Sequence, residues 1–268
     1  MLSEKNQFKQ KVFAIANQKG GVGKTTTTIN LATGLAAVGL KILIIDLDPQ
    51  GNASTGLGIE KDDRTVNSYS VISGATEISE AIRKSKIPNL DLIVATVDLL
   101  GAEIELIDEE QRGYKLDKQI KSLKKQLKYD YILIDCPPAL GILTLNALTA
   151  ADSVLVPLQC EFFALEGLSQ LMKTVEMVKL TFNPNLKLDG IILTMFDKRN
   201  NLSEQVADDA RKNLGSTVFD TVIPRNVRIS EAPSHGIPAL LYDYNCSGSV
   251  AYMNLAKEFI EREEVALI

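Results

Sequence analysis

The chain has 268 residues, of which 45% are hydrophobic and 24% charged, with a formal net charge of −5. The charge argues against a protein coated in positive charge, while leaving room for a local basic patch, and three cysteines with one histidine argue against disulfide frameworks, CxxC metal sites and most histidine-based triads. No stretch approaches the roughly 18 consecutive apolar residues of a membrane span, and the polar start lacks a signal-peptide pattern, so we expect a cytoplasmic protein.

Short apolar, β-branched runs alternate with longer helical patterns along the chain. Several runs are apolar on both faces, which is typical of parallel strands covered by helices. The alternation predicts a single-domain α/β fold, with a doubly wound, mostly parallel twisted sheet flanked by helices over 11–268 and a flexible tail over 1–10. The expected strands are 12–17, 41–46, 91–96, 131–135, 152–158, 189–196 and 217–223. The expected helices are 25–38, 98–109, 114–128, 142–150, 163–181, 203–214 and 247–262.

The first strand is followed by the segment NQKGGVGKTTTT, which partly matches a phosphate-binding loop. That loop reads G-x-x-x-x-G-K-[ST], and Gly23, Lys24 and Thr25 fill its last three positions. Its first glycine is replaced by Gln18, and a second lysine, Lys19, follows. One lysine is enough to hold a phosphate, so the extra lysine needs an explanation of its own.

The residue types of this loop suit a nucleoside triphosphate. Gly20, Gly21 and Gly23 allow a tight turn that points backbone N–H groups inward, and the helix that starts near Lys24 adds the positive end of its dipole. We expect Lys24 to contact the β- and γ-phosphates and the Thr25 hydroxyl to ligate Mg²⁺. The loop therefore predicts a nucleotide site.

Three aspartates end two other predicted strands. Asp135 closes the run YILID, where the second magnesium-holding carboxylate of a nucleotide hydrolase belongs. Asp46 and Asp48 lie at the start of the segment 46–58, which we expect to be a mobile loop rather than a helix. Asp48 is the better candidate to orient the attacking water, but it equally suits turn initiation before Pro49, and both interpretations stay open.

These stretches together resemble the ParA/Soj family of chromosome- and plasmid-partitioning ATPases, which belong to the deviant-Walker ATPases that also include MinD. The family loop reads K-G-G-x-G-K-[ST], and residues 19–25 match it at every position. The stretches DLDPQGNAST (46–55), YDYILIDCPPALG (129–141) and IPRNVRISEAPSHG (223–236) match further family segments. The resemblance extends over nearly the whole chain and implies a P-loop NTPase fold.

The resemblance also implies the cofactors, ATP or ADP with Mg²⁺, and an ATP-bound homodimer with two nucleotides between the subunits. Lys19 would then reach the partner's phosphates and act in catalysis together with Lys24 and Asp48. Asp135 would hold Mg²⁺ through a water beside Thr25, with Asp48 as a further candidate ligand, and Pro224 and Asn226 would lie against the adenine. The full expected nucleotide-binding set is Lys19, Gly20, Gly21, Val22, Gly23, Lys24, Thr25, Thr26, Pro224 and Asn226.

The family's dimers bind double-stranded DNA without sequence preference, and Arg199 and Arg228 match its DNA-contacting positions. The implied protein partner is a ParB-type centromere-binding protein, and the implied location is the nucleoid. A MinD-like membrane role would need a basic amphipathic C-terminal helix, whereas AKEFIEREEVALI is acidic. An iron–sulfur protein like the nitrogenase iron protein is disfavoured because the chain's three cysteines lack that family's contexts. A protein that binds nucleotide without turnover remains a third alternative.

Overall fold

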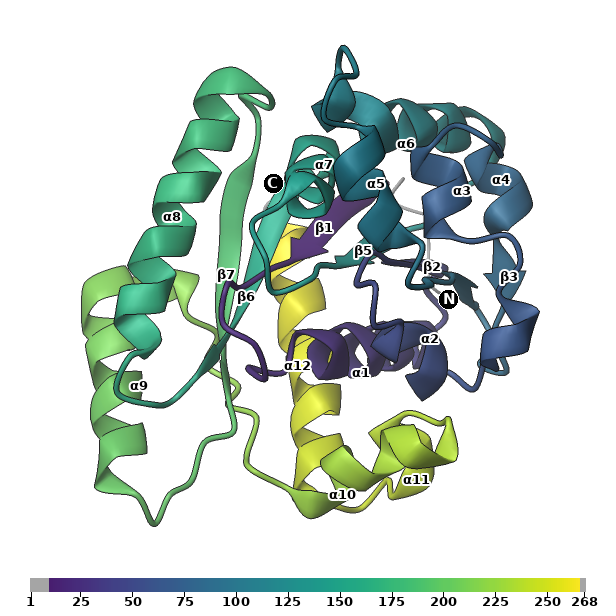
Figure 1. The fold of residues 1–268 in the computed structure, drawn as a ribbon. Coiled ribbons are helices and arrows are strands. Elements are labelled where there is room, and N and C mark those ends of the chain that lie inside the picture. Colours follow the sequence, from purple (N-terminus) through teal and green to yellow (C-terminus); the bar gives the residue numbers. More distant parts are fainter. Residues whose placement is uncertain (1–9, 266–268) are drawn as a thin grey trace.

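The computed structural model describes residues 10–265 and is built on one seven-stranded sheet (Figure 1). The strand order is β3-β4-β2-β5-β1-β6-β7, and every pairing is parallel except that of the short β3 with β4. This confirms the predicted fold class. The strands are β1 (Lys11–Ile15), β2 (Ile42–Asp46), β3 (Arg83–Lys84), β4 (Leu90–Ile93), β5 (Tyr131–Asp135), β6 (Ser153–Gln159) and β7 (Lys187–Thr194).

Helices cover both faces of this sheet (Figure 1). The longer ones are α1 (Lys24–Ala37), α5 (Leu99–Glu105), α6 (Lys115–Gln126), α7 (Ile142–Ala150), α8 (Ala164–Thr181), α9 (Asn201–Leu214) and α12 (Ser247–Val265). The shorter ones are α2 (Asn52–Gly56), α3 (Ser68–Ile72), α4 (Ile78–Ala81), α10 (Val227–Glu231) and α11 (Ala239–Tyr242). No helix within residues 10–265 is long and apolar enough to cross a membrane.

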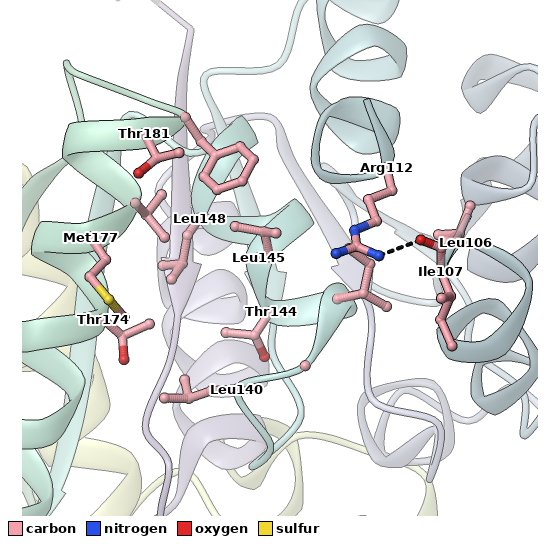
Figure 2. Close-up of a pocket in the computed structure, with 14 residues that line it drawn as sticks. Leu106, Ile107, Arg112, Leu140, Thr144, Leu145, Leu148, Thr174, Met177 and Thr181 are labelled. Carbon is pink, nitrogen blue, oxygen red and sulfur yellow. Dashed lines mark hydrogen bonds between the residues drawn. The ribbon is translucent and has the colours of Figure 1, made fainter. Parts of the chain in front are cut away.

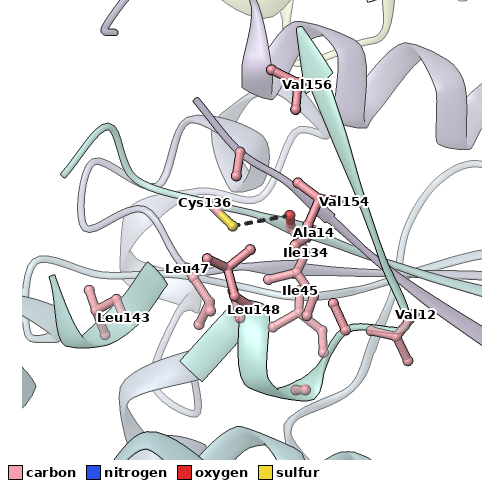
Figure 3. Close-up of a cluster of buried hydrophobic side chains, with 14 of the residues drawn as sticks. Val12, Ala14, Ile45, Leu47, Ile134, Cys136, Leu143, Leu148, Val154 and Val156 are labelled. Carbon is pink, nitrogen blue, oxygen red and sulfur yellow. Dashed lines mark hydrogen bonds between the residues drawn. The ribbon is translucent and has the colours of Figure 1, made fainter. Parts of the chain in front are cut away.

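The core lies in two apolar layers, one on each face of the sheet. Side chains of β1, β2, β5 and β6 that point to one face pack against α7 (Figure 3). Those that point to the other face pack against α1 and α12, where the rings of Phe13, Tyr131 and Phe259 meet edge to face. Burial on both faces explains why these strands are continuous apolar runs in the sequence.

The predicted strand at 217–223 is wrong. One isolated bridge, Ile191 with Val218, joins this segment to β7, and the Phe219 and Ile223 N–H groups donate to the Ile191 and Leu193 oxygens at 2.9 Å and 2.8 Å. Between them, the main-chain N–H groups of Asp220 and Thr221 donate to the Glu258 carboxylate on α12, each at 2.8 Å. A side chain of another element therefore interrupts the pairing with β7 between these two main-chain bonds, and no continuous strand forms.

Segment 46–58 also differs from its prediction as a loop, because it contains the helix α2. The start of this helix is fixed by tertiary contacts, since the Ser54 N–H and hydroxyl both donate to the buried Asp46 carboxylate. Ala53 and Leu57 are buried in the core. The segment is thus a packed part of the fold.

Candidate nucleotide-binding site

The glycine-rich loop joins β1 to α1 and contains two residues in the left-handed region of the backbone. Gly21 has a φ of 74° and Gly23 a φ of 91°, values that side chains other than glycine rarely adopt. Gly23 is also the residue before the first turn of the 14-residue helix α1. The loop and the helix N-terminus together provide the arrangement of backbone N–H groups that binds anions.

Lys24 is buried beneath this loop, with only 6% of its surface exposed. Its ammonium donates a hydrogen bond to the main-chain oxygen of Lys19, at 3.1 Å. Burial lowers the pKa of Lys24, and the nearby carboxylates of Asp135 and Asp48 oppose that shift. A buried cation whose hydrogen bond goes to a neutral oxygen is well suited to receive an anionic ligand.

The loop is held in place by two polar residues that the sequence did not single out. Asn17 accepts from the Lys19 N–H at 3.0 Å and donates to the Pro157 oxygen at 2.7 Å, which ties the loop to β6. Thr194, the last residue of β7, donates to the Val22 oxygen at 2.8 Å. Both are polar residues at the carboxyl end of a strand, and that position was the available signal.

Asp135 lies beside the first turn of α1, where Thr25 and Thr28 bind its two oxygens. The Thr25 hydroxyl donates at 2.8 Å and the Thr28 hydroxyl at 3.1 Å. Burial and the nearby Asp46 raise the pKa of Asp135 well above its usual range. A hydroxyl and a carboxylate in contact form an oxygen donor set that suits Mg²⁺. Thr28 was missed because it lies one turn beyond the motif.

Asp46 and Asp48 occupy the neighbouring position, after β2. Asp46 is fully buried, accepts from Ser54 at 2.7 Å and 2.9 Å and from the Asp48 N–H at 3.2 Å, and burial raises its pKa to about 6. Asp48 is 8% exposed and accepts from the Gln50 N–H at 2.9 Å. The turn-forming contact of Asp48 is therefore present. The Asp48 carboxylate also lies near enough to Lys24 to influence the pKa of Lys24.

Lys19 lies on the open side of the loop, away from the buried contacts of Lys24. Its ammonium forms a half-exposed ion pair with Glu161, at 3.2 Å. Glu161 also receives a hydrogen bond from Gln159 and lies 4.0 Å from the Arg225 guanidinium. The two lysines of the loop thus have different surroundings, one buried beneath it and one at the surface.

The side-chain hydrogen bonds of Asn226 are made with α10 and α12. Asn226 caps α10 by accepting from the Arg228 N–H at 2.8 Å, and it donates to Ser247 at 3.0 Å. Thr26 instead lines a cavity of about 240 Å³ between α1, α2 and the segment 229–239. Neither Pro224 nor Asn226 lines that cavity.

Both arginines predicted to contact DNA are exposed and paired with acids. Arg199 binds Asp197 at 2.9 Å. Arg228 binds Glu231 at 3.0 Å, lies 3.6 Å from Asp243 and stacks over the Tyr242 ring. Their positive charges are locally compensated in this structure.

An apolar cavity of about 520 Å³ begins just beyond the strand that carries Asp135 (Figure 2). Its lining includes Leu140, Leu145, Leu148 and Met177. Arg112 also lines the cavity, and its guanidinium donates to the Ile107 main-chain oxygen. Such a lining lacks the convergent donors that a triphosphate needs. The glycine-rich loop is therefore the better candidate for the nucleotide.

The chain is similar to several known proteins over almost its full length. A family model described as an AAA domain matches residues 10–188. The chain is 57% identical to the chromosome partitioning protein ParA of Caulobacter vibrioides (strain NA1000 / CB15N), over 94% of this chain and 95% of that protein. It is 51% identical to the sporulation initiation inhibitor protein Soj of Bacillus subtilis (strain 168), over 92% and 97%.

Among solved structures, one described as a cobyrinic acid a,c-diamide synthase from Mycobacterium smegmatis with bound ADP and magnesium superposes with a TM-score of 0.82. It is 36% identical, with 96% of each chain covered. The chain's sequence identity to ParA and to Soj is markedly higher than its identity to the Mycobacterium smegmatis protein. The chain therefore belongs to the ParA/Soj family of chromosome partitioning proteins.

Proposed function

We propose that this chain is a magnesium-dependent ATPase that partitions DNA, acting as a slow switch between an ATP-bound dimer on DNA and a released form. The observation that carries this is the contact of Thr25 with Asp135 beside the buried Lys24. These three side chains provide a cation for phosphates and oxygen ligands for a metal, on the loop that matches the family motif. Membership of the partitioning family supports DNA as the cargo.

The residues of the site fit a magnesium-bound nucleotide. Lys24 would exchange its bond with the Lys19 oxygen for phosphate oxygens, and the N–H groups of residues 20–25 would hold the remaining phosphate charge. Thr25 and, through a water, Asp135 would hold Mg²⁺, which would neutralise charge on the phosphates. The related Mycobacterium smegmatis structure contains ADP and magnesium, which supports this assignment. Pro224 and Asn226 remain the proposed adenine contacts.

Lys19 explains why the loop carries two lysines. In the proposed face-to-face dimer, Lys19 leaves Glu161 and contacts the phosphates bound to the partner subunit, while Lys24 serves its own nucleotide. A positive charge supplied in trans stabilises the charge that develops on the leaving oxygens. Because the Lys19–Glu161 pair is half-exposed, breaking it costs little, about 0–1 kcal/mol.

The dimer binds double-stranded DNA through phosphate contacts of Arg199 and Arg228, which set affinity rather than sequence preference. Phosphates must displace Asp197 from the first arginine and Glu231 and Asp243 from the second. Pairing two subunits doubles the number of such contacts on one assembly, so that a local basic patch binds DNA although each subunit carries a net charge of −5. A ParB-type partner then accelerates hydrolysis and releases the protein from the nucleoid.

A membrane-bound, MinD-like role is not favoured by the described part of α12. Arg262 is engaged by Glu258 and by the Ser216 and Val218 oxygens, and Lys257 pairs with Glu261. No face of basic residues is therefore presented by this part of the helix to anionic lipid.

The proposal is tested by measuring retention on random-sequence duplex DNA with ATP, with ADP and without nucleotide. We expect strong binding only with ATP, slow release as ATP is hydrolysed, and a steep loss of affinity with salt. Sedimentation with anionic vesicles under the same conditions addresses the membrane alternative. Vesicle binding without DNA binding would replace the proposed function, and stable ATP binding with no phosphate release would reduce the chain to a nucleotide-binding protein.

A further inference from the structure

The opposite end of the sheet from the nucleotide loop carries a second concentration of positive charge. The segments that enter β2, β4 and β5 surround a cavity of about 580 Å³. Four exposed lysines line it, namely Lys41, Lys84, Lys86 and Lys128, and we call this cavity with its four lysines the basic pocket. Parallel strands bring these segments together because their amino ends all lie at one edge of the sheet.

The lysines of the basic pocket form no ion pair in the described part of the chain, unlike the two arginines proposed to contact DNA, although Lys86 also lines a neighbouring cavity with Glu60 and Asp62. Within residues 10–265, none of the four forms an ion pair with a carboxylate. The one acid in the lining, Asp91, accepts from the Tyr129 hydroxyl at 2.8 Å. An acid beside the pocket, Asp130, accepts from the Lys41 main-chain N–H at 2.7 Å.

The backbone that carries these lysines is fixed by local hydrogen bonds. Ser85, between Lys84 and Lys86, donates its hydroxyl to the Leu90 oxygen at 2.7 Å and accepts from the Ile87 N–H at 3.0 Å. The Ile87 side chain is buried. The Asp130 N–H donates to the Lys41 oxygen at 2.8 Å, which joins the segment before β5 to the segment before β2. The charges therefore project from a preorganised edge.

We propose that the basic pocket is a second DNA-contacting surface, which binds phosphates of the duplex backbone whether or not nucleotide is bound. Exposed, separated ammonium groups suit phosphates bound by counterion release, whereas a small anion would need buried donors. The pocket stays open in the proposed face-to-face dimer because it lies at the sheet end opposite the nucleotide loop. This inference rests on the proposed DNA binding and adds weak phosphate contacts that ATP does not control, while strong retention on DNA still requires the paired contacts of the ATP-bound dimer.

The test is charge reversal with a matched control. Lys84→Glu/Lys86→Glu/Lys128→Glu is compared with Lys118→Glu/Lys121→Glu/Lys125→Glu on α6, which makes the same change in net charge. Affinity for random-sequence duplex DNA is measured against salt, without nucleotide and with a non-hydrolysable ATP analogue, and thermal melting verifies that both variants fold.

We expect the basic-pocket variant to lower the slope of log affinity against log salt by up to roughly 2.7, at about 0.9 for each phosphate that the variant no longer binds. Between 50 and 200 mM salt, its affinity should then fall by about 40-fold less than that of wild type. The weaker salt dependence should appear in both nucleotide states, and the α6 variant should keep the wild-type slope.

Three outcomes overturn the inference. Equally weakened binding in both variants would show an effect of net charge alone, and wild-type affinity in the basic-pocket variant would place all DNA contacts elsewhere. Loss of binding to phosphatidylglycerol vesicles with unchanged DNA binding would make the pocket a lipid site. If instead the wild type binds no DNA even with ATP, the proposed function fails together with this inference.

Discussion

The ammonium of Lys24 donates a hydrogen bond to the main-chain oxygen of Lys19, five residues earlier in the same loop. The side chain of Lys24 is thereby linked to the backbone of Lys19, while the Lys19 side chain extends to Glu161. If phosphates take the Lys24 ammonium, as proposed, the Lys19 oxygen loses its partner. Nucleotide binding in one subunit therefore changes the surroundings of the residue proposed to serve the other subunit.

Lys24→Ala should abolish tight binding of magnesium-ATP. The variant loses a charge-assisted hydrogen bond of about 2 kcal/mol or more in a desolvated site, which corresponds to at least roughly 30-fold in affinity. Calorimetric titration measures this directly. Affinity near that of wild type would show that the triphosphate binds elsewhere.

Lys19→Ala should still bind ATP through Lys24 and the glycine-rich loop, but it should lose hydrolysis. Mixing it with Asp48→Ala, also inactive alone, tests whether Lys19 acts in trans. In a two-fold dimer of one subunit of each kind, one site contains an intact Asp48 and an intact Lys19 from opposite chains. Random mixing makes half of the dimers mixed, so activity should recover to about a quarter of wild type.

Dimer content must be measured in the same samples, because Lys19→Ala can also weaken pairing. Mixed dimers that form and remain inactive would show that Lys19 does not complete its neighbour's site.

Asp48→Ala should bind ATP and dimerise but hydrolyse poorly, so that the protein persists on DNA. The observed bond from the Gln50 N–H to Asp48 offers a way to separate the two interpretations of this residue. Asp48→Asn keeps an acceptor for that bond and removes the charge. If catalysis needs the carboxylate, both variants fail in a phosphate-release assay. If only the turn matters, the asparagine variant turns over normally.

Arg199→Glu and Arg228→Glu should weaken DNA binding while ATP-dependent dimerisation is kept. The ion pair of Arg199 with Asp197 supplies a converse variant, since Asp197→Asn frees the guanidinium without removing the acceptor for the Arg199 main-chain N–H. We expect Asp197→Asn to bind DNA more tightly than wild type in a gel-shift titration. Unchanged binding in all three variants would place the ATP-dependent contacts on other residues.

Ser54→Ala should destabilise the fold, because the buried Asp46 carboxylate loses its closest donor. An unsatisfied buried polar group costs about 1–3 kcal/mol, and in a chain of this size each kcal/mol lowers the melting temperature by about 2–4 °C. Asp46→Asn in the same background should recover part of the loss, since it removes the buried charge. A melting temperature equal to that of wild type would show that the two backbone donors suffice.

The sequence was most informative where a local pattern and the tertiary structure agree. The strands that carry the site are buried on both faces, so their apolar runs stand out, and the glycine-rich loop has a spacing that few other functions need. The position of Asp135 followed from the rule that parallel strands end at one edge, and the register confirms it by pairing Asp135 with both Ile15 and Asp46.

The remaining features depend on partners that are distant in the chain. The run at 217–223 has strand composition, but Glu258 of α12 binds its backbone. The helix α2 contains Gly and Ser and is fixed by Asp46, eight residues before Ser54. Glu161, which holds Lys19, is 142 residues away from it. No local pattern reports such contacts, and they could be found only in the folded chain.

The hydrogen bond from Thr194 to Val22 also bears on how the protein is made. The loop is encoded near the start of the chain, yet β1 lies between β5 and β6, and the loop is braced by the end of β7. The ribosome must therefore add more than 170 residues after Val22 before the hydrogen bond from Thr194 to Val22 can form. At about 5–20 residues per second this takes on the order of ten seconds or more, and the nascent chain cannot hold nucleotide in its final geometry during that time. A stall before β5 and β6 are synthesised would leave the apolar β1 without its neighbours, in a form that chaperones recognise.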